Sequence, residues 1–321
     1  MGQTVGIVGL GMIGHLHVQA LEQIEGVDVI GGADTGTGRT LRYRGRQLPV
    51  YRRIDDLLDS SPSAVIVATP TPTHAGIYRR LAAHEKRPRL VLMEKPLGSS
   101  LAEVDDILGS GGGMEVTGLY HAAHAPEVLW AMDHALAWQE TYGAFSGYLA
   151  SFADPYRERG RAHNQVYVNS WVDSGINALS AAYRFLQLTA IDQLAVLDEQ
   201  NSAFRASVRF RSNGRENAGT IETSWAVPVP AKHTILRLGE ATHLYLDHQL
   251  ATGQLTHGDT VREEFAYTGT VPRLQMHYEN NFRSIFIDKK GYYTAGDSRL
   301  LHRLLFARAP EQPPSPARPR G

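Results

Sequence analysis

The segment from residue 5 to residue 34 limits the fold of this chain more narrowly than any other. It starts with residues 5–8, VGIV, a short apolar run typical of a strand buried on both faces. Three glycines follow at the G-x-G-x-x-G spacing: Gly9, Gly11 and Gly14. A segment with helical periodicity comes next, and residues 27–33 form a second apolar run that ends at Asp34. This order predicts a strand–helix–strand unit of an α/β sheet.

Each glycine has a physical task if this unit binds a dinucleotide. Gly9 makes the tight turn, Gly11 lacks a Cβ and lets a pyrophosphate approach the backbone, and Gly14 lets the helix pack closely on the strand. The first helical turn presents free N–H groups and a positive dipole end to the phosphates. We expect two residues of this turn to contact the cofactor, Met12 and Ile13. Asp34, twenty residues beyond Gly14, can accept a hydrogen bond from a ribose 2′-hydroxyl.

The residues around the second strand bear on the choice between NAD and NADP. The Asp34 carboxylate favours NAD, because it would repel the 2′-phosphate of NADP. Arg39 leaves NADP open, since an arginine just beyond this strand can hold that phosphate. A basic, weakly helical stretch follows with Arg42, Arg44 and Arg46, which we interpret as a solvated helix face. We expect NAD, with NADP as the alternative.

Length and charge exclude several classes of protein. A chain of 321 residues suits two domains, and its net charge of −1 gives no electrostatic reason to bind nucleic acid or an acidic membrane surface. No cysteine is present, which excludes disulfides and a cysteine nucleophile and fits a reducing cytoplasm. Neither a secretory leader nor an apolar run of about 20 residues is visible. We expect a soluble cytoplasmic protein.

Two further buried strands end in loops whose side chains could take part in binding or catalysis. Residues 64–68 lead into a Thr-Pro-Thr-Pro loop, and a helix begins near His74. Residues 90–93 run directly into Glu94-Lys95-Pro96. Ligands bind at the carboxyl ends of parallel strands, so we expect Lys95 near a nicotinamide ring. The expected cofactor contacts in these loops are Thr69, Pro70, His74, Glu94 and Lys95.

The second half of the chain has a different pattern. Strand-like stretches follow one another without helices between them, at residues 144–152, 193–198, 204–211, 218–225 and 234–238, with two or three more between 242 and 267. This predicts an α+β domain with one large, mostly antiparallel sheet. We predict a Rossmann domain at 1–121, a substrate-binding and oligomerisation domain at 122–309, and a disordered tail at 310–321. The open sheet needs a cover for its second face, which predicts a homodimer or homotetramer.

Four motifs together resemble one oxidoreductase family, the glucose–fructose oxidoreductase / inositol dehydrogenase (Gfo/Idh/MocA) family. They are the glycine motif, residues 68–74 (ATPTPTH), residues 94–96 (EKP) and a D-x-G-x-N pattern that starts at Asp173. The resemblance implies a Rossmann domain followed by a large-sheet domain. It also implies hydride transfer between NAD(P) and a hydroxyl or carbonyl group of a sugar or sugar derivative. Lys95 would contact both the substrate hydroxyl and the cofactor.

One position departs from the family pattern. The family often has histidine where this chain has Asn177, and an amide cannot exchange a proton at neutral pH. The sequence around Asp173 and Asn177, and residues 120–126 with His121, resemble the subgroup of aldose 1-dehydrogenases. Asp34 speaks against that subgroup, whose members commonly lack an acid there and favour NADP.

The residues suggest how a hydroxyl could be oxidised. We expect Lys95 to take the hydroxyl proton, which requires a site that favours its neutral form, since a free lysine has a pKa of about 10.4. Asp173 and Asn177 lie four residues apart on one helical face, where Asp173 can bond the hydroxyl or Lys95 and Asn177 a neighbouring hydroxyl. His121 is the second candidate base or a substrate contact. Arg157, in an irregular segment, is either solvated or binds a phosphorylated or nucleotide-linked sugar.

Other readings remain open at this stage. No H-x-x-x-H or H-E-x-x-H pattern occurs, and we predict no catalytic metal. The alternatives within enzymes are a nucleotide-sugar, sugar-phosphate or cyclitol dehydrogenase or ketoreductase. A non-catalytic NAD(P)-binding sensor is an alternative of another class, and the presence of both Lys95 and Asp173 argues against it. A methyltransferase using S-adenosylmethionine gives the Thr-Pro and Glu-Lys-Pro loops no role.

Overall fold

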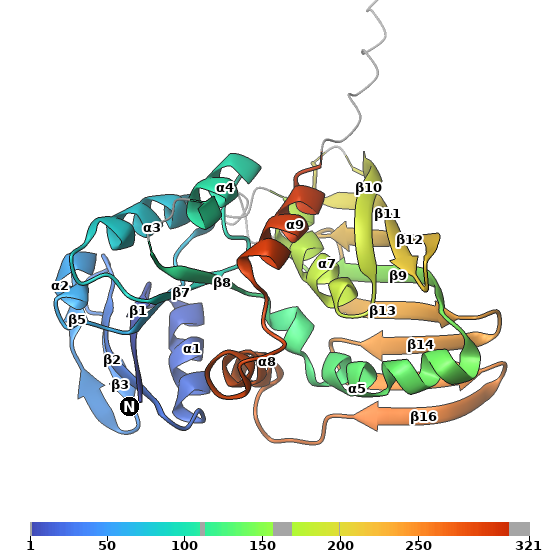
Figure 1. Ribbon diagram of the computed structural model, residues 1–321, viewed down its shortest axis with the longest axis horizontal. Helices are drawn as coiled ribbons and strands as arrows, with labels where there is room; N and C mark the ends of the chain where they lie inside the picture. Colours follow the sequence, from blue (N-terminus) through green and yellow to red (C-terminus); the bar gives the residue numbers. More distant parts are fainter. Residues whose placement is uncertain (1, 110–112, 157–168, 199, 308–321) are drawn as a thin grey trace, which may run out of the picture.

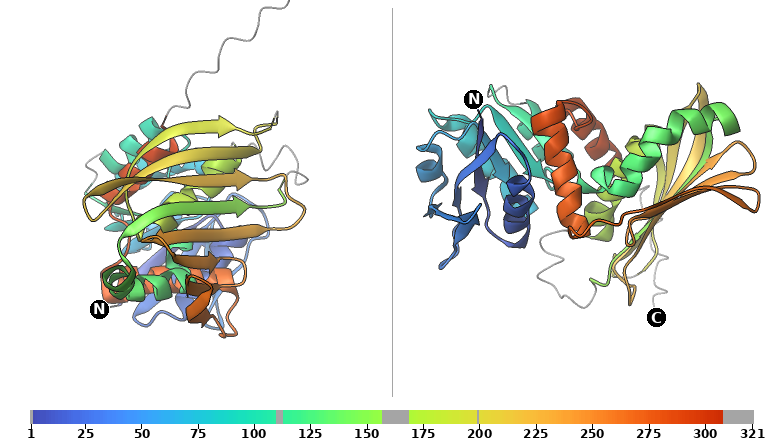
Figure 2. Two further views of the ribbon diagram at one scale, coloured as in Figure 1. Left: turned by 90° about the vertical axis from the view of Figure 1, so that its right-hand side faces the viewer. Right: turned by 90° about the horizontal axis from the view of Figure 1, so that it is seen from below.

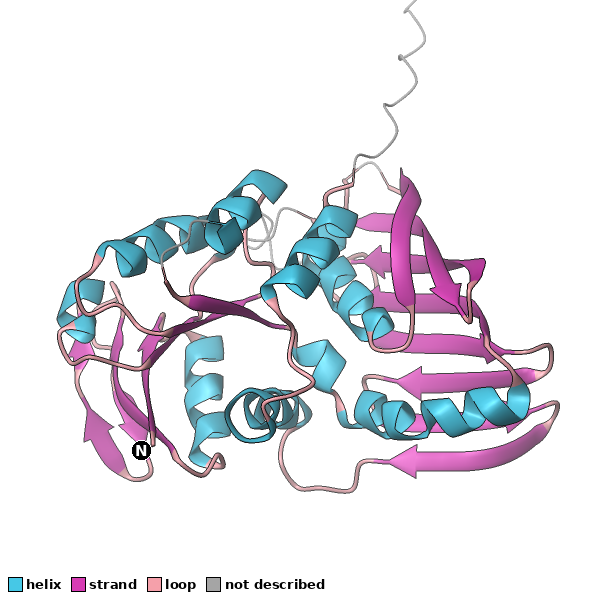
Figure 3. Cartoon of the chain, in the orientation of Figure 1, coloured by secondary structure: helices cyan, strands magenta, loops and turns pink. Residues whose placement is uncertain are grey.

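The computed structural model describes residues 2–109, 113–156, 169–198 and 200–307. Two sheets lie side by side in it, a six-stranded sheet from the first part of the chain and an eight-stranded sheet from the second (Figure 1). Helices flank the first sheet, and further helices lie between the two sheets (Figure 3). This confirms the predicted fold class of a Rossmann-type domain followed by a large, mostly antiparallel sheet.

The first sheet is parallel throughout, in the order β5-β2-β1-β6-β7-β8. Its strands are β1 Gln3–Val8, β2 Val27–Ala33, β5 Val50–Tyr51, β6 Ala64–Val67, β7 Leu90–Glu94 and β8 Glu115–Leu119. Its helices are α1 Met12–Glu22, α2 Ile54–Leu58, α3 His74–Ala83 and α4 Leu101–Gly109. The strand order reverses between β1 and β6, and such a switch point opens a crevice at the carboxyl ends of the strands.

Alternate residues of these strands enter two separate cores. Along β6, Val65 and Val67 pack with α3 and α4 on one face, whereas Ile66 packs with α1 on the other. All three side chains are fully buried. The near-continuous apolar runs of the sequence follow from this burial on both faces.

The basic stretch after β2 is a hairpin, so the predicted helix there is wrong, although Arg42, Arg44 and Arg46 are exposed as predicted. Strands β3 Leu41–Tyr43 and β4 Arg46–Leu48 pair antiparallel around Arg44 and Gly45, both with positive φ. Tyr43 is buried, and its hydroxyl donates to Val27 O at 2.7 Å. The alternation of apolar and basic residues, rather than the arginines themselves, carried the signal.

The second sheet has the order β10-β11-β12-β9-β13-β14-β15-β16 and is antiparallel except where β9 pairs with β12. Its strands are β9 Phe145–Ala153, β10 Gln187–Val196, β11 Ala203–Ser212, β12 Arg215–Ser224, β13 Ala231–Leu238, β14 Thr242–Asp247, β15 Thr252–His257 and β16 Thr260–Ala266. Strand β10 starts six residues before the predicted strand at 193, because it is largely exposed and offers little apolar alternation.

Helices cover one face of this sheet. They are α5 Pro126–Tyr142 and α7 Ile176–Tyr183, with α7 preceded by a π-helical turn at Trp171–Gly175. On the other face Leu149 and Tyr245 are 38% and 39% exposed, and no described helix of this chain covers them. Figure 2 shows this face toward the viewer in its left-hand view.

The end of the chain returns to the first domain. Helix α8 Arg273–Arg283 packs on α1, where Tyr278 and Phe282 surround the buried ring of His17. Helix α9 Ala295–Leu305 packs against α4 and β8. The views of Figure 2 show both helices between the two sheets. These contacts make the last helices the link between the two halves.

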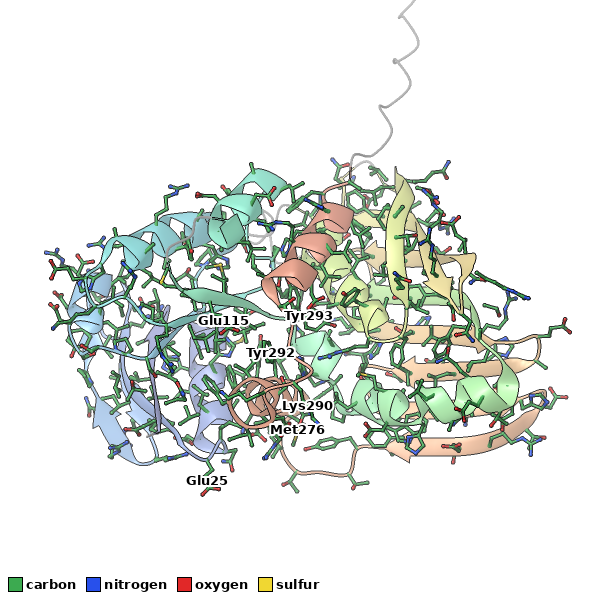
Figure 4. The ribbon with its side chains drawn as sticks, in the orientation of Figure 1. Glu25, Glu115, Met276, Lys290, Tyr292 and Tyr293 are labelled. Atoms are coloured by element: carbon green, nitrogen blue, oxygen red, sulfur yellow. The ribbon has the colours of Figure 1, made fainter. Side chains whose placement is uncertain are left out.

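Tyr293 lies at this link, just before α9, and is labelled in Figure 4. Its buried hydroxyl donates to Ser180 O at 2.6 Å, and its ring lies 4.8 Å from that of Tyr120. The predicted boundary between residues 121 and 122 stays a prediction, and the predicted tail at 310–321 lies outside the described residues.

We expect Phe282→Ala to lower the apparent free energy of unfolding by about 3–5 kcal/mol, because the side chain is fully buried between α8 and α1. Denaturant unfolding measures this loss. The matched control Phe265→Ala, on the edge strand β16, removes a partly exposed ring and should cost clearly less. Equal losses for both variants would contradict the packing of α8 on the first domain.

Candidate active site

A cavity of about 510 Å³ lies where the two domains meet. Its walls come from the glycine loop, the loops after β6 and β7, the π-helical turn, the end of β9 and the start of α8. The carboxyl ends of the central parallel strands therefore face the second domain across this space. Most of the residues that the sequence singled out lie on its walls.

The glycine loop has the shape that a dinucleotide needs. Gly9 has φ +93°, and a Cβ on Gly14 would lie 2.0 Å from Gly9 O, so α1 packs tightly against the loop. At Gly11 a Cβ would meet nothing within 4 Å, which leaves open space beside the backbone. Helix α1 begins there without a side-chain cap, with Met12 78% exposed and Met12 and Ile13 lining the cavity. This geometry fits a pyrophosphate at the helix N-terminus.

Asp34 braces the same loop. Its Oδ2 accepts from Leu10 N and its Oδ1 from Gly36 N, each at 2.6 Å, and Arg39 Nε lies 3.5 Å from Oδ1. Burial alone would raise the pKa of Asp34, but the two backbone hydrogen bonds and Arg39 hold it below its usual value. The carboxylate therefore stays charged beside the expected ribose site. That negative charge disfavours a 2′-phosphate.

The loop after β6 divides the expected contacts into two groups. Thr69 and Pro70 line the cavity. His74 does not line it; its buried ring lies behind the loop, with Nε2 2.8 Å from Thr69 O and Nδ1 3.2 Å from Leu97 O. Burial holds the pKa of His74 below its usual value. The structure thus gives His74 the place of a loop support.

Lys95 and Asp173 meet across the domain junction. Lys95 Nζ donates to Asp173 Oδ1 at 2.8 Å and to Asp173 O at 3.1 Å. Both side chains are only 10% exposed, and both line the cavity. Asp173 belongs to the π-helical turn, a local widening of the helix that is frequent at functional sites.

Asn177 follows one turn later. Its Nδ2 donates to Asp173 O at 3.3 Å, while its Oδ1 has no hydrogen-bond partner among the described residues. The side chain is 8% exposed and lines the cavity. A buried oxygen without a partner is costly, so Asn177 offers an acceptor to a ligand hydroxyl.

Two stacked histidines form the adjoining wall. His121 and His277 have ring centroids 5.8 Å apart, and His121 Nδ1 and both nitrogens of His277 have no hydrogen-bond partner among the described residues. Burial holds the pKa of His121 well below its usual value, with the charge of Lys95 next in importance. Burial and the charge of Arg273 do the same for His277. Both rings are therefore neutral at physiological pH.

Glu94 points to the first domain beneath Lys95. Its Oε1 lies 2.9 Å from His17 Nε2 and accepts from the Tyr278 hydroxyl at 2.7 Å. Burial alone would raise the pKa of Glu94, but His17, Tyr278 and Lys95 hold it below its usual value. Two neighbouring residues thus have different partners: Glu94 contacts α1 and α8, and Lys95 contacts Asp173.

Sequence reasoning missed one wall of the cavity. Lys232 Nζ lies 2.8 Å from Asp154 Oδ1, and His248 Nδ1 lies 2.7 Å from the buried Glu127 Oε1. Arg273 lies at the start of α8. These residues come from strand ends and a helix start far apart in the chain, and no local pattern joins them. The predicted contact Arg157 lies outside the described residues.

Residues 3–110 match the model of an oxidoreductase family with an NAD-binding Rossmann fold, Gfo/Idh/MocA. This match covers about a third of the chain, and it assigns the first domain to the NAD-binding Rossmann type. The assignment agrees with the glycine loop, the charged Asp34 and the parallel sheet. The N-terminal domain is thus similar to the NAD-binding domains of Gfo/Idh/MocA oxidoreductases.

Two curated relatives are similar over part of their length. The rhizopine catabolism protein MocA of Rhizobium meliloti is 30% identical over 100 residues, which are 31% of each chain. The myo-inositol 2-dehydrogenase of Thermotoga maritima is 32% identical over 108 residues, 32% of this chain and 31% of that protein. The matched stretch thus spans about a third of these relatives.

A solved structure is similar over nearly the whole chain. The inositol dehydrogenase homolog of Azotobacter vinelandii, complexed with NADH and myo-inositol, has a TM-score of 0.75 at 15% identity. The match covers 95% of this chain and 94% of that one. At this identity the comparison shows a common fold for both domains.

Two classes of feature have no match in the described part of the chain. No three histidine, aspartate or glutamate side chains there come together as a metal site requires. No described helix is long and apolar enough to cross a membrane.

We expect Gly11→Ala to weaken NADH binding about 10–100-fold, because the new methyl group enters the space beside the backbone that a pyrophosphate needs, at the cost of charge-assisted hydrogen bonds. Fluorescence titration measures the affinity. The control Gly76→Ala, in α3 and also without neighbours within 4 Å, should leave it unchanged. Thermal stability should be retained in both, and a Gly11→Ala variant with normal affinity would contradict this pyrophosphate site.

We expect the free energy of unfolding to fall as the pH drops from about 7 toward 5. Burial lowers the folded-state pKa of His124, so the unfolded chain binds the proton first and the stabilisation present above pH 6.5 is lost on acidification. His124→Gln, which keeps an acceptor for Arg184, should flatten this dependence. The exposed control His243→Gln should not, and an unchanged slope in His124→Gln would count against a buried neutral ring.

Proposed function

We propose that this protein is an NAD-dependent dehydrogenase that oxidises a hydroxyl group of a sugar or sugar derivative, with NADP as the alternative cofactor. The observation that carries the proposal is the buried Lys95–Asp173 pair on the wall of a cavity shared with the glycine loop. A pair of proton-handling groups beside a dinucleotide site is what hydroxyl oxidation requires. A cofactor sensor without turnover has no need for it.

The nicotinamide of bound NAD supplies the acceptor for the hydride. The protein's own residues then have three tasks. Lys95, in the neutral form that the positive charge of the bound NAD⁺ ring favours, accepts the proton of the reacting hydroxyl, while Asp173 fixes the direction of the Lys95 amine. Asn177 accepts a bond from a neighbouring hydroxyl through its free Oδ1. His121, half-buried in the same wall and neutral, is the second candidate base.

The finer assignment of substrate is also a proposal. The D-x-G-x-N pattern and His121 favour an aldose oxidised at carbon 1. The names of the inositol dehydrogenases that match part of the chain favour a cyclitol as the second candidate. NADH formation measured over free aldoses, inositols and sugar phosphates separates these, and turnover of none of them supports the sensor.

Assembly and location complete the proposal. The face of the large sheet that carries Leu149 and Tyr245 would meet another subunit, in a homodimer or homotetramer. The absence of cysteine is consistent with a cytoplasmic location.

We expect Lys95→Ala to lower kcat about 10²–10⁴-fold, the usual effect of removing a general acid/base, while NADH affinity is largely kept. Initial rates of NADH formation and a fluorescence titration measure the two quantities. Lys86→Ala, at a lysine 52% exposed on the surface, is the control and should behave as wild type. Turnover near the wild-type rate in Lys95→Ala would reject the proposed role.

A further inference from the structure

Arg273 lines the cavity and has no carboxylate partner among the described residues. Its Nη2 donates to Gln249 Oε1 at 3.4 Å, and no ion pair joins it to any described residue. The charges of Glu127, Asp154 and Asp247 act on it from a greater distance. Arg273 is half-buried, and a charged group that is partly removed from water is stabilised by a hydrogen-bonded anion beside it.

The position of Arg273 in its helix adds to this cost. It is the first residue of α8, an 11-residue helix whose N-cap, Pro272, provides no side-chain cap. The free N–H groups at the start of α8 and the positive end of its dipole therefore lie beside the positive charge of Arg273. Like charges placed together are unfavourable. Burial also lowers the pKa of Arg273. An anion bound at this point would relieve all of these effects together.

Neighbouring groups are poised for the same kind of ligand. His277, one turn along α8, is 1% exposed, lines the cavity and has no hydrogen-bond partner for either ring nitrogen among the described residues. Lys232 lines the cavity too, held by Asp154. Lys95, Lys232 and Arg273 line the same cavity as His121, and the charge of each lowers the pKa of that ring.

We propose that the substrate carries an anionic oxygen group, a carboxylate or a phosphate, which binds to Arg273 and the N-terminus of α8 beside Lys232 and His277. This inference rests on the proposed function, because the hydroxyl end of the same molecule lies at Lys95. One continuous cavity contains both ends. A neutral sugar would leave the half-buried Arg273 with no anion hydrogen-bonded to it.

Calorimetry on the NADH-loaded protein tests this with matched ligands. The probes are D-glucose, D-glucuronate and D-glucose 6-phosphate, together with the corresponding galactose series. We expect the carboxylate or the phosphate member of a series to bind about 10–100-fold more tightly than the neutral sugar, as for a charge-assisted hydrogen bond. The better of the two anions identifies which group the site takes. Equal affinities throughout overturn the inference.

Variants locate the effect. Arg273→Gln should lower the ratio of anion to neutral-sugar affinity by about the same 10–100-fold, and Arg273→Lys should restore part of it. Arg283→Gln, the same change at the exposed far end of α8, should leave the ratio unchanged. An anion preference that survives Arg273→Gln overturns the inference.

The outcome separates this inference from the proposed function. Turnover that depends on Lys95 but shows no preference for anions rejects the inference alone. A preference that depends on Arg273, without Lys95-dependent turnover of any probe, rejects the proposed function alone. If neither anion binds, the inference fails whatever the turnover.

Discussion

The ion pair between Lys95 and Asp173 sets the position of the chemical groups that face the cavity from the two domains. The two residues come from the parallel sheet and from the helix of the second domain, and both are almost fully removed from water. Such a pair adds little net stability, yet losing one partner leaves an uncompensated charge and costs about 3–5 kcal/mol. It therefore fixes geometry: with the pair closed, the helix that bears Asn177 has a defined position over the end of β7.

Glu94 makes this constraint two-sided. Because Glu94 is bound by His17 and Tyr278 while Lys95 is bound by Asp173, the strand end is held from both directions. Helix α8, near the end of the chain, completes one of these contacts and also begins at the cavity with Arg273. The parts proposed to bind the cofactor and those proposed to face the substrate are thus joined by direct contacts.

Local periodicity and spacing were enough to predict much of this from the sequence. Burial and turn geometry act on residues that are close in the sequence. They therefore leave local patterns, namely the glycine spacing, the apolar runs of β1, β6 and β7 and the acid after β2. The hairpin at 41–48 was misread because three arginines masked an alternating pattern. The wall with Lys232, His248 and Arg273 was missed because tertiary packing alone brings these side chains together. His277 could not be recognised from the sequence either, because its helical spacing is shared with many core residues.

The pairing of strand β9 determines which parts of the large sheet can tolerate insertions. Strand β9 pairs with β12 in parallel on one side and with β13 in antiparallel fashion on the other, so it is the seam between two meanders, β10–β12 and β13–β16. Each meander closes mainly through its own short-range hairpins. Insertions at the outer strands β10 and β16 can therefore accumulate without disturbing the seam, whose end at Phe152 and Asp154 lines the cavity. The outer strands can thus vary while the cavity keeps its dimensions.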